Sequence, residues 1–84
     1  AVDELQQERL TSVLLPLSGK LLDRTVGDVE WGSLGVQLVS LRRKTGQVIK
    51  LTDDVVLMAG DTLLLSGKSD MLERAERMLL KEGN

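Results

Sequence analysis

A turn, an apolar strand and an amphipathic helix follow one another in the last third of the chain, and they decide the fold. The turn and the strand read Ala59-Gly60-Asp61-Thr62-Leu63-Leu64-Leu65-Ser66. Gly60 and Asp61 are typical turn residues, and the aliphatic run that follows them predicts a strand. From Ser69 onward, apolar residues recur every three or four positions, which predicts a helix that Ser69 or Asp70 caps and Gly83 ends.

Towards the N-terminus from this segment, residues 36–42 form the clearest other strand. Aliphatic side chains occupy both of its faces, so the strand requires cover on both sides. Residues 44–46 have the composition of a hairpin turn and lead into a predicted strand over residues 47–51. A further short strand is predicted over residues 55–58, directly before the turn at Gly60.

The first part of the chain predicts one strand and one short helix. Residues 11–17 are rich in β-branched and aliphatic side chains, and Pro16 ends the strand. Thr25 and Asp28 have the spacing of a capping box, so we expect a helix of one or two turns through Trp31. The order of these elements predicts an α+β fold, in which a small mixed or antiparallel sheet has a short helix after the first strand and an amphipathic helix at the C-terminal end.

Size and composition limit the chain to one small domain with few reactive side chains. The 84 residues amount to 9.2 kDa, and Trp31 is the single aromatic residue. Because domains commonly contain about 100–150 residues, a second domain is excluded. The chain has no histidine and no cysteine, and so lacks the usual general base, thiolate nucleophile and zinc ligands. We therefore expect no enzymatic activity, no metal site and no cofactor that this domain requires.

Charge and hydropathy argue against two classes of partner. The formal net charge is −2 and the isoelectric point is near 5.0, which argues against binding to nucleic-acid phosphates. The apolar runs, such as residues 63–65, are far shorter than the roughly 18 residues that indicate a membrane span. Residues 1–9 are mostly polar and begin at Ala1, so we expect them to be a linker that arrives from an upstream region of a longer protein.

Three short motifs each permit a functional and a structural interpretation. Gly67-Lys68-Ser69 lies between a strand and a helix, as in a phosphate-binding loop, but Thr62 stands where that loop needs a glycine. Arg42-Arg43-Lys44 suits an anionic ligand and equally an exposed hairpin tip. Asp53-Asp54 and Asp61 suggest a cation site, yet they lack the alternating acids of a calcium loop and are typical of turns. The structural interpretation is favoured for all three motifs.

An ordered set of motifs resembles the TrkA-C domain, which is the C-terminal lobe of RCK regulatory domains. The resemblance covers residues 10–80. Its motifs are Asp23-Arg24-Thr25-Val26-Gly27-Asp28-Val29, Leu34-Gly35-Val36-Gln37-Leu38-Val39-Ser40-Leu41-Arg42-Arg43, Gly46-Gln47-Val48-Ile49 and Ala59-Gly60-Asp61-Thr62-Leu63-Leu64-Leu65-Ser66-Gly67. Within them, Thr25, Gly35, Gly60, Asp61 and Gly67 are the positions to which we assign a structural role.

The resemblance implies that residues 10–84 form a cytoplasmic regulatory domain of a protein of the inner or plasma membrane. It implies a homodimer, an upstream Rossmann-type nucleotide-binding lobe and a membrane transport domain as partners. The parent protein that we favour is a monovalent cation/proton antiporter of the potassium-efflux type. The alternative is a purely structural dimerisation module of a peripheral potassium-uptake regulator or of another permease. A thin aliphatic core and a strand that is apolar on both faces also favour a dimer.

The resemblance further suggests Gln37, Arg42 and Arg43 as ligand-binding residues. Some family members bind cyclic di-AMP between two copies, using an asparagine where Gln37 aligns and a proline where this chain has Lys50 and Leu51. A basic residue of those members is replaced in the region of residues 31–33. These differences disfavour cyclic di-AMP, so a small anionic ligand at the two arginines is the expectation, beside the alternative that the domain only dimerises and relays a signal.

Overall fold

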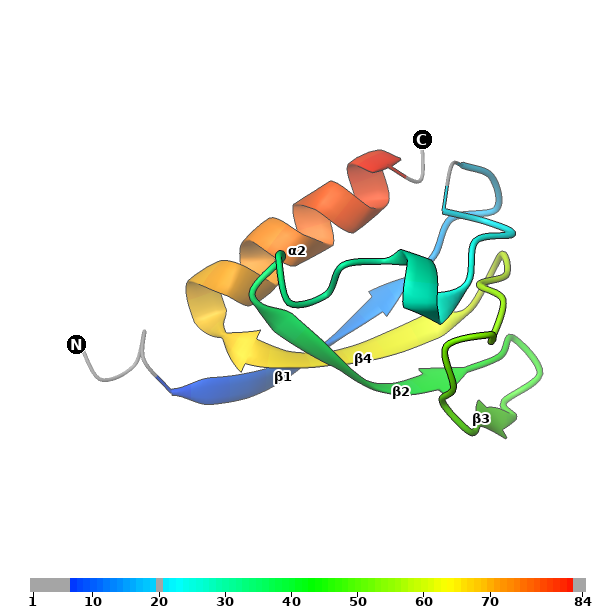
Figure 1. The fold of residues 1–84 in the computed structure, drawn as a ribbon, viewed down its shortest axis with the longest axis horizontal. Helices are drawn as coiled ribbons and strands as arrows, with labels where there is room; N and C mark the ends of the chain where they lie inside the picture. The colour runs from blue at the N-terminus through cyan, green and yellow to red at the C-terminus, as the bar shows by residue number, and fades with distance from the viewer. Residues whose placement is uncertain (1–6, 20, 83–84) are drawn as a thin grey trace.

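The computed structural model describes residues 7–19 and 21–82, and it confirms the α+β fold. Four antiparallel strands form one sheet in the order β1-β4-β2-β3, and the C-terminal helix α2 packs on one face of that sheet (Figure 1). The elements are β1 Glu8–Leu14, the single 3-10 turn η1 Val26–Asp28, β2 Val36–Arg42, β3 Val48–Ile49, β4 Thr62–Lys68 and α2 Ser69–Glu82. The predicted strand over residues 36–42 and the predicted start of the helix at Ser69 are both confirmed.

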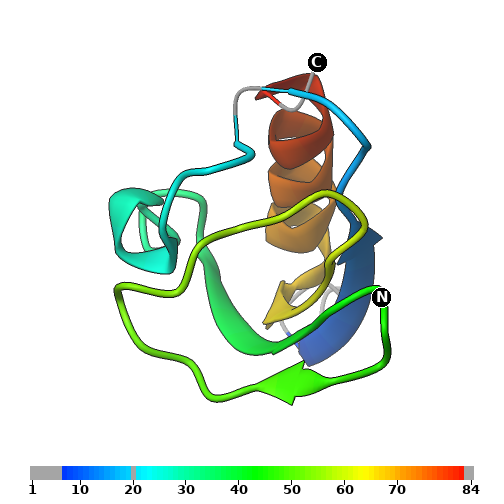
Figure 2. The same ribbon diagram turned by 90° about the vertical axis from the view of Figure 1, so that its right-hand side faces the viewer.

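β4, which contains the aliphatic run, is an inner strand of the sheet, where strands on both sides and α2 on one face can cover its side chains. It pairs with β1 on one side and with β2 on the other. Leu63 and Leu65 are completely buried, and they face α2. The layer between sheet and helix contains the buried side chains Val13, Val36, Leu41, Leu63, Leu65, Leu72, Ala75 and Leu79. The segment that contains η1 lies beside α2 (Figure 2), so the core is one apolar layer between the sheet and these two covers.

A bulge in β2 explains how this strand presents aliphatic side chains on both faces. Leu38 pairs with Leu65 and Ser40 pairs with Leu64, so Val39 is an extra residue in the ladder. The extra residue lets both Leu38 and Leu41 lie on the covered face, since an uninterrupted strand would place them on opposite faces. Val39 itself remains 45% exposed.

Two predicted elements are wrong in length or kind. The expected helix of one or two turns is reduced to η1, because the N–H groups of Val26 and Gly27 donate to the carbonyl oxygens of Val55 and Asp53 at 2.8 and 2.9 Å. The same hydrogen bonds explain why residues 55–58 do not form a strand. Only an isolated bridge between Thr25 and Val56 remains there.

The other strand boundaries shift by a few residues. β1 ends at Leu14, before Pro16, and starts at Glu8, so Glu8 and Arg9 of the expected linker belong to the sheet. β3 is limited to Val48–Ile49 within the predicted residues 47–51, and β4 continues to Lys68. Residues 1–6 of the expected linker and the expected helix end at Gly83 lie outside the described residues.

In the described part of the chain, the sheet face opposite α2 is open, and it carries a mixture of aliphatic and polar side chains. Leu14 pairs with Thr62, Thr62 with Arg42 and Arg42 with Val48, so these four side chains form one row on this face. Leu14 is 63% exposed and Val48 59%, and Leu10 at the other end of β1 is 62% exposed. One face of the sheet therefore offers leucine and valine side chains to solvent at both of its edges.

Candidate functional site

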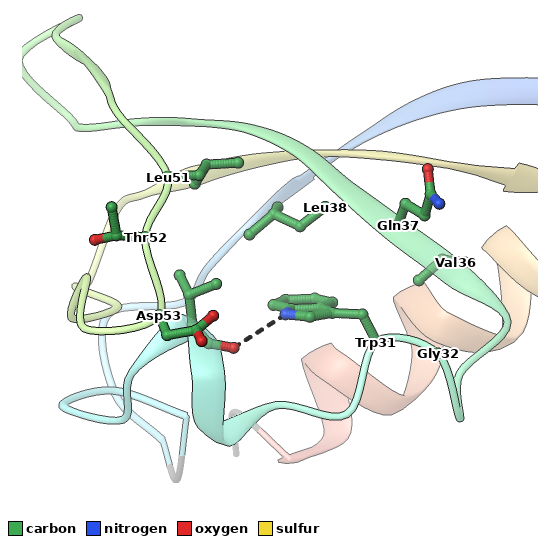
Figure 3. A pocket seen from close by; sticks show the side chains of 9 residues that line it. Trp31, Gly32, Val36, Gln37, Leu38, Leu51, Thr52 and Asp53 are labelled. Atoms are coloured by element: carbon green, nitrogen blue, oxygen red, sulfur yellow. Dashed lines mark hydrogen bonds between the residues drawn. The ribbon is translucent and has the colours of Figure 1, made fainter.

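A groove of about 490 Å³ lies between the start of β2 and the loop that precedes residue 55. Trp31, Leu38 and Leu51 form much of its apolar lining, and Asp53 is the charged side chain that reaches it. Figure 3 shows the Trp31 ring between β2 and this loop. Small-molecule sites are commonly concave and apolar with a few polar groups at fixed positions, so this groove is the candidate site.

The wall formed by Trp31 is held by hydrogen bonds at both its side chain and its main chain. The indole Nε1–H donates to the carbonyl oxygen of Val26 at 3.1 Å, and the Trp31 carbonyl accepts the N–H of Val36 at 3.1 Å. The ring is partly buried and remains accessible from the groove. These bonds fix the orientation of the one flat aromatic surface in the chain.

The opposite wall is tied to the segment around η1 by main-chain hydrogen bonds. Leu57 donates to the carbonyl of Arg24 at 2.8 Å, and Asp23 donates to the carbonyl of Leu57 at 3.0 Å. A Cβ on Gly27 would lie 2.8 Å from the Cβ of Asp53, so only glycine allows the two segments to approach this closely. The groove is therefore built by the contact between residues 23–27 and residues 53–57.

Gln37 lies at the edge of the groove, but its amide points to the other side of β2. Figure 3 shows this side chain directed away from Trp31, as the alternation along a strand requires. Gln37 pairs with Ser66, which pairs with Leu10. The Gln37 amide is therefore on the open face of the sheet and not inside the groove.

Arg43 forms an ion pair with a buried carboxylate. Its Nη1 donates to Oδ2 of Asp61 at 2.5 Å and to the carbonyl oxygen of Val56 at 2.9 Å. Oδ2 of Asp61 also accepts the N–H of Met58 at 2.9 Å, and Asp61 is completely buried, with no hydrogen-bond partner for Oδ1 among the described residues. Because a buried carboxylate is costly unless it is paired, Arg43 holds the loop of residues 56–61 against the end of β2.

The three residues suggested as ligand contacts therefore do not share one site. Arg42 is exposed on the open sheet face between Thr62 and Val48. Arg43 contacts Asp61, and Gln37 lies near the opposite end of β2. An anionic ligand in the groove would meet Asp53 and no basic side chain among the lining residues.

The glycines and Thr25 of the structural motif lie where the backbone needs them. Gly35 has φ of +78°, and a Cβ there would lie 2.8 Å from the Met71 Sδ. Gly60 has φ of +82° in the turn before Asp61, and a Cβ on Gly67 would lie 3.1 Å from the Gly35 carbonyl oxygen. The N–H of Thr25 donates to Oδ2 of Asp28 at 3.4 Å, which is one half of the predicted capping box.

The remaining motifs have structural surroundings. Gly67 and Lys68 are part of β4 and Ser69 begins α2, so strand and helix join without the loop that cradles a phosphate. Among the described residues, acidic side chains form no group of three that could hold a metal ion. The Thr52 hydroxyl donates to Asp54 and keeps the pKa of that carboxyl below its ordinary value of 3.8. No helix in residues 7–19 and 21–82 has the length and apolar character needed to cross a bilayer.

Trp31 is the groove residue to which the sequence analysis gave no functional role. The local pattern predicts it as the end of a short helix, and its region departs from the cyclic di-AMP pattern. The available signal was that Trp31 is the single aromatic residue in 84. Tryptophan is enriched at binding surfaces, because its ring offers apolar contact area and its N–H can donate a hydrogen bond.

Comparison with protein families gives one match to this chain. The model of the TrkA-C domain matches residues 10–80, while no curated protein matches the sequence. The match spans most of the chain, which therefore belongs to the TrkA-C domain family, whose members are cytoplasmic regulatory domains of potassium and other cation transport proteins.

Proposed function

We propose that this TrkA-C domain senses a small ligand in the Trp31 groove and passes the signal to a second copy of itself. A ligand can shift an equilibrium between two arrangements of a dimer only through its different affinity for the two. The groove suits this role because its two walls belong to different segments, residues 23–31 and residues 51–57, which are joined by hydrogen bonds. In this proposal the domain regulates transport and catalyses no reaction.

The observation that carries the proposal is the position of the Trp31 ring in a groove of about 490 Å³. A flat ring held at its Nε1 offers a stacking surface, Leu38 and Leu51 add apolar contacts, and Asp53 accepts hydrogen bonds at the rim. This chemistry fits a planar heterocycle with a hydrogen-bond donor at its edge, such as a purine base. Any anionic part of such a ligand would project out of the groove, because the lining contains no basic side chain.

Isothermal titration calorimetry and Trp31 fluorescence test this proposal with adenosine, AMP and cyclic di-AMP as probes. Because Trp31 is the only tryptophan, a change in emission reports on the groove alone. We expect at least one probe to bind and to change the emission, and we expect Asp53→Asn to weaken that binding. The matched control is Asp54→Asn, which alters an adjacent exposed acid outside the groove lining and should leave the affinity unchanged.

A result without heat or emission change for all three probes would favour the alternative function. The domain would then be a purely structural dimerisation module of a peripheral potassium-uptake regulator or of another permease. Thermal unfolding with and without ligand separates these cases, since both functions require a dimer at micromolar concentration and only the sensor changes its melting temperature with ligand.

For the parent protein, we propose a monovalent cation/proton antiporter of the potassium-efflux type. Family membership supports a potassium or cation transport protein, and the mostly polar sequence before β1, residues 1–7, supports a linker from an upstream lobe. The coding sequence upstream of Ala1 tests this proposal. A Rossmann segment with G-x-G-x-x-G and about ten apolar spans of 18 or more residues would support the antiporter, whereas a Rossmann segment alone would support the peripheral regulator.

A further inference from the structure

Among residues 7–19 and 21–82, β1 is an edge strand whose outer main-chain groups have no neighbouring strand in the sheet. The N–H of Leu15 donates to the Asp61 carbonyl at 2.8 Å, and the Leu15 carbonyl accepts the N–H of Gly60. Because successive residues of a strand direct these groups to opposite sides, Leu15 bonds towards β4 and the groups of Leu10, Ser12 and Leu14 point outward. These three residues form the free edge of β1.

The centre of this edge lacks the features that usually prevent strand pairing. Natural edge strands are commonly protected by charged residues, proline, bulges or short length. In β1 the charged residues Glu8 and Arg9 lie at the start of the strand, and Pro16 lies beyond its end. Residues 10–15 contain neither a charge nor a proline, so another strand can approach the edge.

The sequence of β1 is nearly symmetric about Ser12. Leu10 and Leu14 are identical, and Thr11 and Val13 are both β-branched residues of similar volume. In an antiparallel pair centred on Ser12, Leu10 therefore lies opposite the partner's Leu14, and Thr11 opposite the partner's Val13. A two-fold axis requires such self-complementarity, because the same patch must serve on both subunits.

We propose that two copies of this domain pair through the free edges of β1, with Ser12 opposite the partner's Ser12. The proposal rests on the proposed dimerisation and assigns it a surface. The outward groups of Leu10, Ser12 and Leu14 then form about six main-chain hydrogen bonds across the axis. The two sheets become one continuous sheet, and on the open face the exposed Leu10 and Leu14 meet the partner's Leu14 and Leu10.

The area that a stable dimer needs indicates that α2 takes part as well. Stable interfaces take about 800 Å² from each partner, and the accessible surface of this chain is 5520 Å². One strand edge cannot supply such an area alone. The flank of α2 borders β1 along a groove of about 260 Å³ that is lined by Leu72, Glu73 and Glu76 of α2 and by Arg9 of β1. The groove as a whole therefore presents charges of both signs to its copy.

Cross-linking tests the register directly, because the chain has no cysteine of its own. Directly opposed residues of an antiparallel pair lie about 4.5–5.5 Å apart at Cα, within the range that a disulfide spans. Ser12→Cys treated with diamide, which oxidises two thiols to one disulfide, should therefore give a covalent dimer. The matched control is Ser40→Cys, which lies in the same row of the same face but on an inner strand and should remain monomeric on a denaturing gel.

Sedimentation equilibrium of two lysine variants tests the same surface without a cross-link. Leu14→Lys places a charge inside the proposed interface, opposite the partner's Leu10, and should raise the dimer dissociation constant about tenfold or more. Val48→Lys changes a residue of similar exposure on the same face at the far edge of the sheet, and it should leave the constant within about twofold. Circular dichroism checks that both variants keep the fold.

The possible outcomes separate this inference from the proposed dimerisation. If the unchanged domain is a dimer, but Ser12→Cys gives no covalent dimer and Leu14→Lys still dimerises, then the β1 surface is wrong and dimerisation stands. A dimer that Val48→Lys disrupts instead also overturns the β1 surface. If the unchanged domain is monomeric at the micromolar concentration at which the proposed function requires a dimer, the proposed dimerisation fails together with this inference.

Discussion

The two ends of β2 use their side chains in opposite ways. At its start, Trp31 and Leu38 line an open groove, and the charged residue of that lining, Asp53, belongs to another segment. Directly after its end, Arg43 contacts the completely buried Asp61 and holds the loop of residues 56–61 against the strand. The difference shows that Arg43, which the sequence suggested as a ligand contact, stabilises the fold instead. The surface that suits a ligand is mainly uncharged.

Replacing Arg43 tests the closed end of β2 and should have the largest effect. Arg43→Met leaves Asp61 buried without its ion partner, which should lower the free energy of unfolding by about 3 kcal/mol. Urea denaturation followed by circular dichroism measures this loss. The neighbouring Arg42→Met removes an exposed cation and should change stability by less than about 0.5 kcal/mol; equal effects of the two substitutions would show that the ion pair contributes little.

Gly35 precedes β2 and tests how rigidly its open end is built. An alanine there must adopt φ near +78° and meet the Met71 side chain, so Gly35→Ala should cost about 2 kcal/mol. The same denaturation experiment applies. Gly32→Ala is the control, since a Cβ at Gly32 meets nothing within 4 Å, and a loss there as large as at Gly35 would contradict the steric explanation.

Trp31→Phe asks how much the indole hydrogen bond adds to the groove wall. The substitution keeps an aromatic ring but removes the donor to the Val26 carbonyl, and should lower the free energy of unfolding by about 1 kcal/mol. Circular dichroism must follow this unfolding because the variant has no tryptophan. Unchanged stability would mean that packing alone holds the ring.

Thr52→Val should have the smallest effect, on the loop that forms the other wall of the groove. Loss of the Thr52 hydroxyl should raise the pKa of Asp54 towards its ordinary value of 3.8. A carboxyl whose pKa is lowered on folding adds stability above its unfolded pKa and loses it as the pH falls. The stability difference between variant and parent should therefore shrink from pH 7 to pH 3.

Carboxyl NMR titration measures the pKa of Asp54 directly. Thr45→Val is the control, since Thr45 lies in the neighbouring hairpin turn, where its hydroxyl oxygen accepts the N–H of Gln47. A pKa of Asp54 that moves in both variants, or in neither, would show that the Thr52 hydroxyl is not its cause.

The sequence predicts the elements whose signal is local and repeated. The helix from Ser69 and the strand over residues 36–42 are found as expected, because each has an apolar pattern of the correct period. Residues 25–31 and 55–58 were misassigned because their main-chain groups bond to each other across the chain. A propensity argument treats each segment separately and cannot detect such a contact.

Contacts between distant segments also explain why the surroundings of the candidate site residues could not be predicted from the sequence. The charge run at residues 42–44 contains two adjacent arginines with different surroundings, since Arg42 faces the open side of the sheet and Arg43 contacts Asp61. Their sequence separation from Asp61 gives no sign of that contact. The groove likewise depends on the approach of residue 53 to Gly27, which only the folded chain brings about.

The central position of β4 determines the order in which this domain can fold. β1 and β2 are consecutive long strands, yet each pairs with β4 and not with the other. Among the described residues, a growing chain that has not reached residue 62 therefore has the short β2–β3 pairing and the contacts between residues 23–27 and 53–57 to form, but neither long pairing of the sheet. Closing the sheet requires distant segments to meet, which makes such topologies slow to fold. Because β1 pairs with β4, it has no partner strand until the last third of the chain has been synthesised.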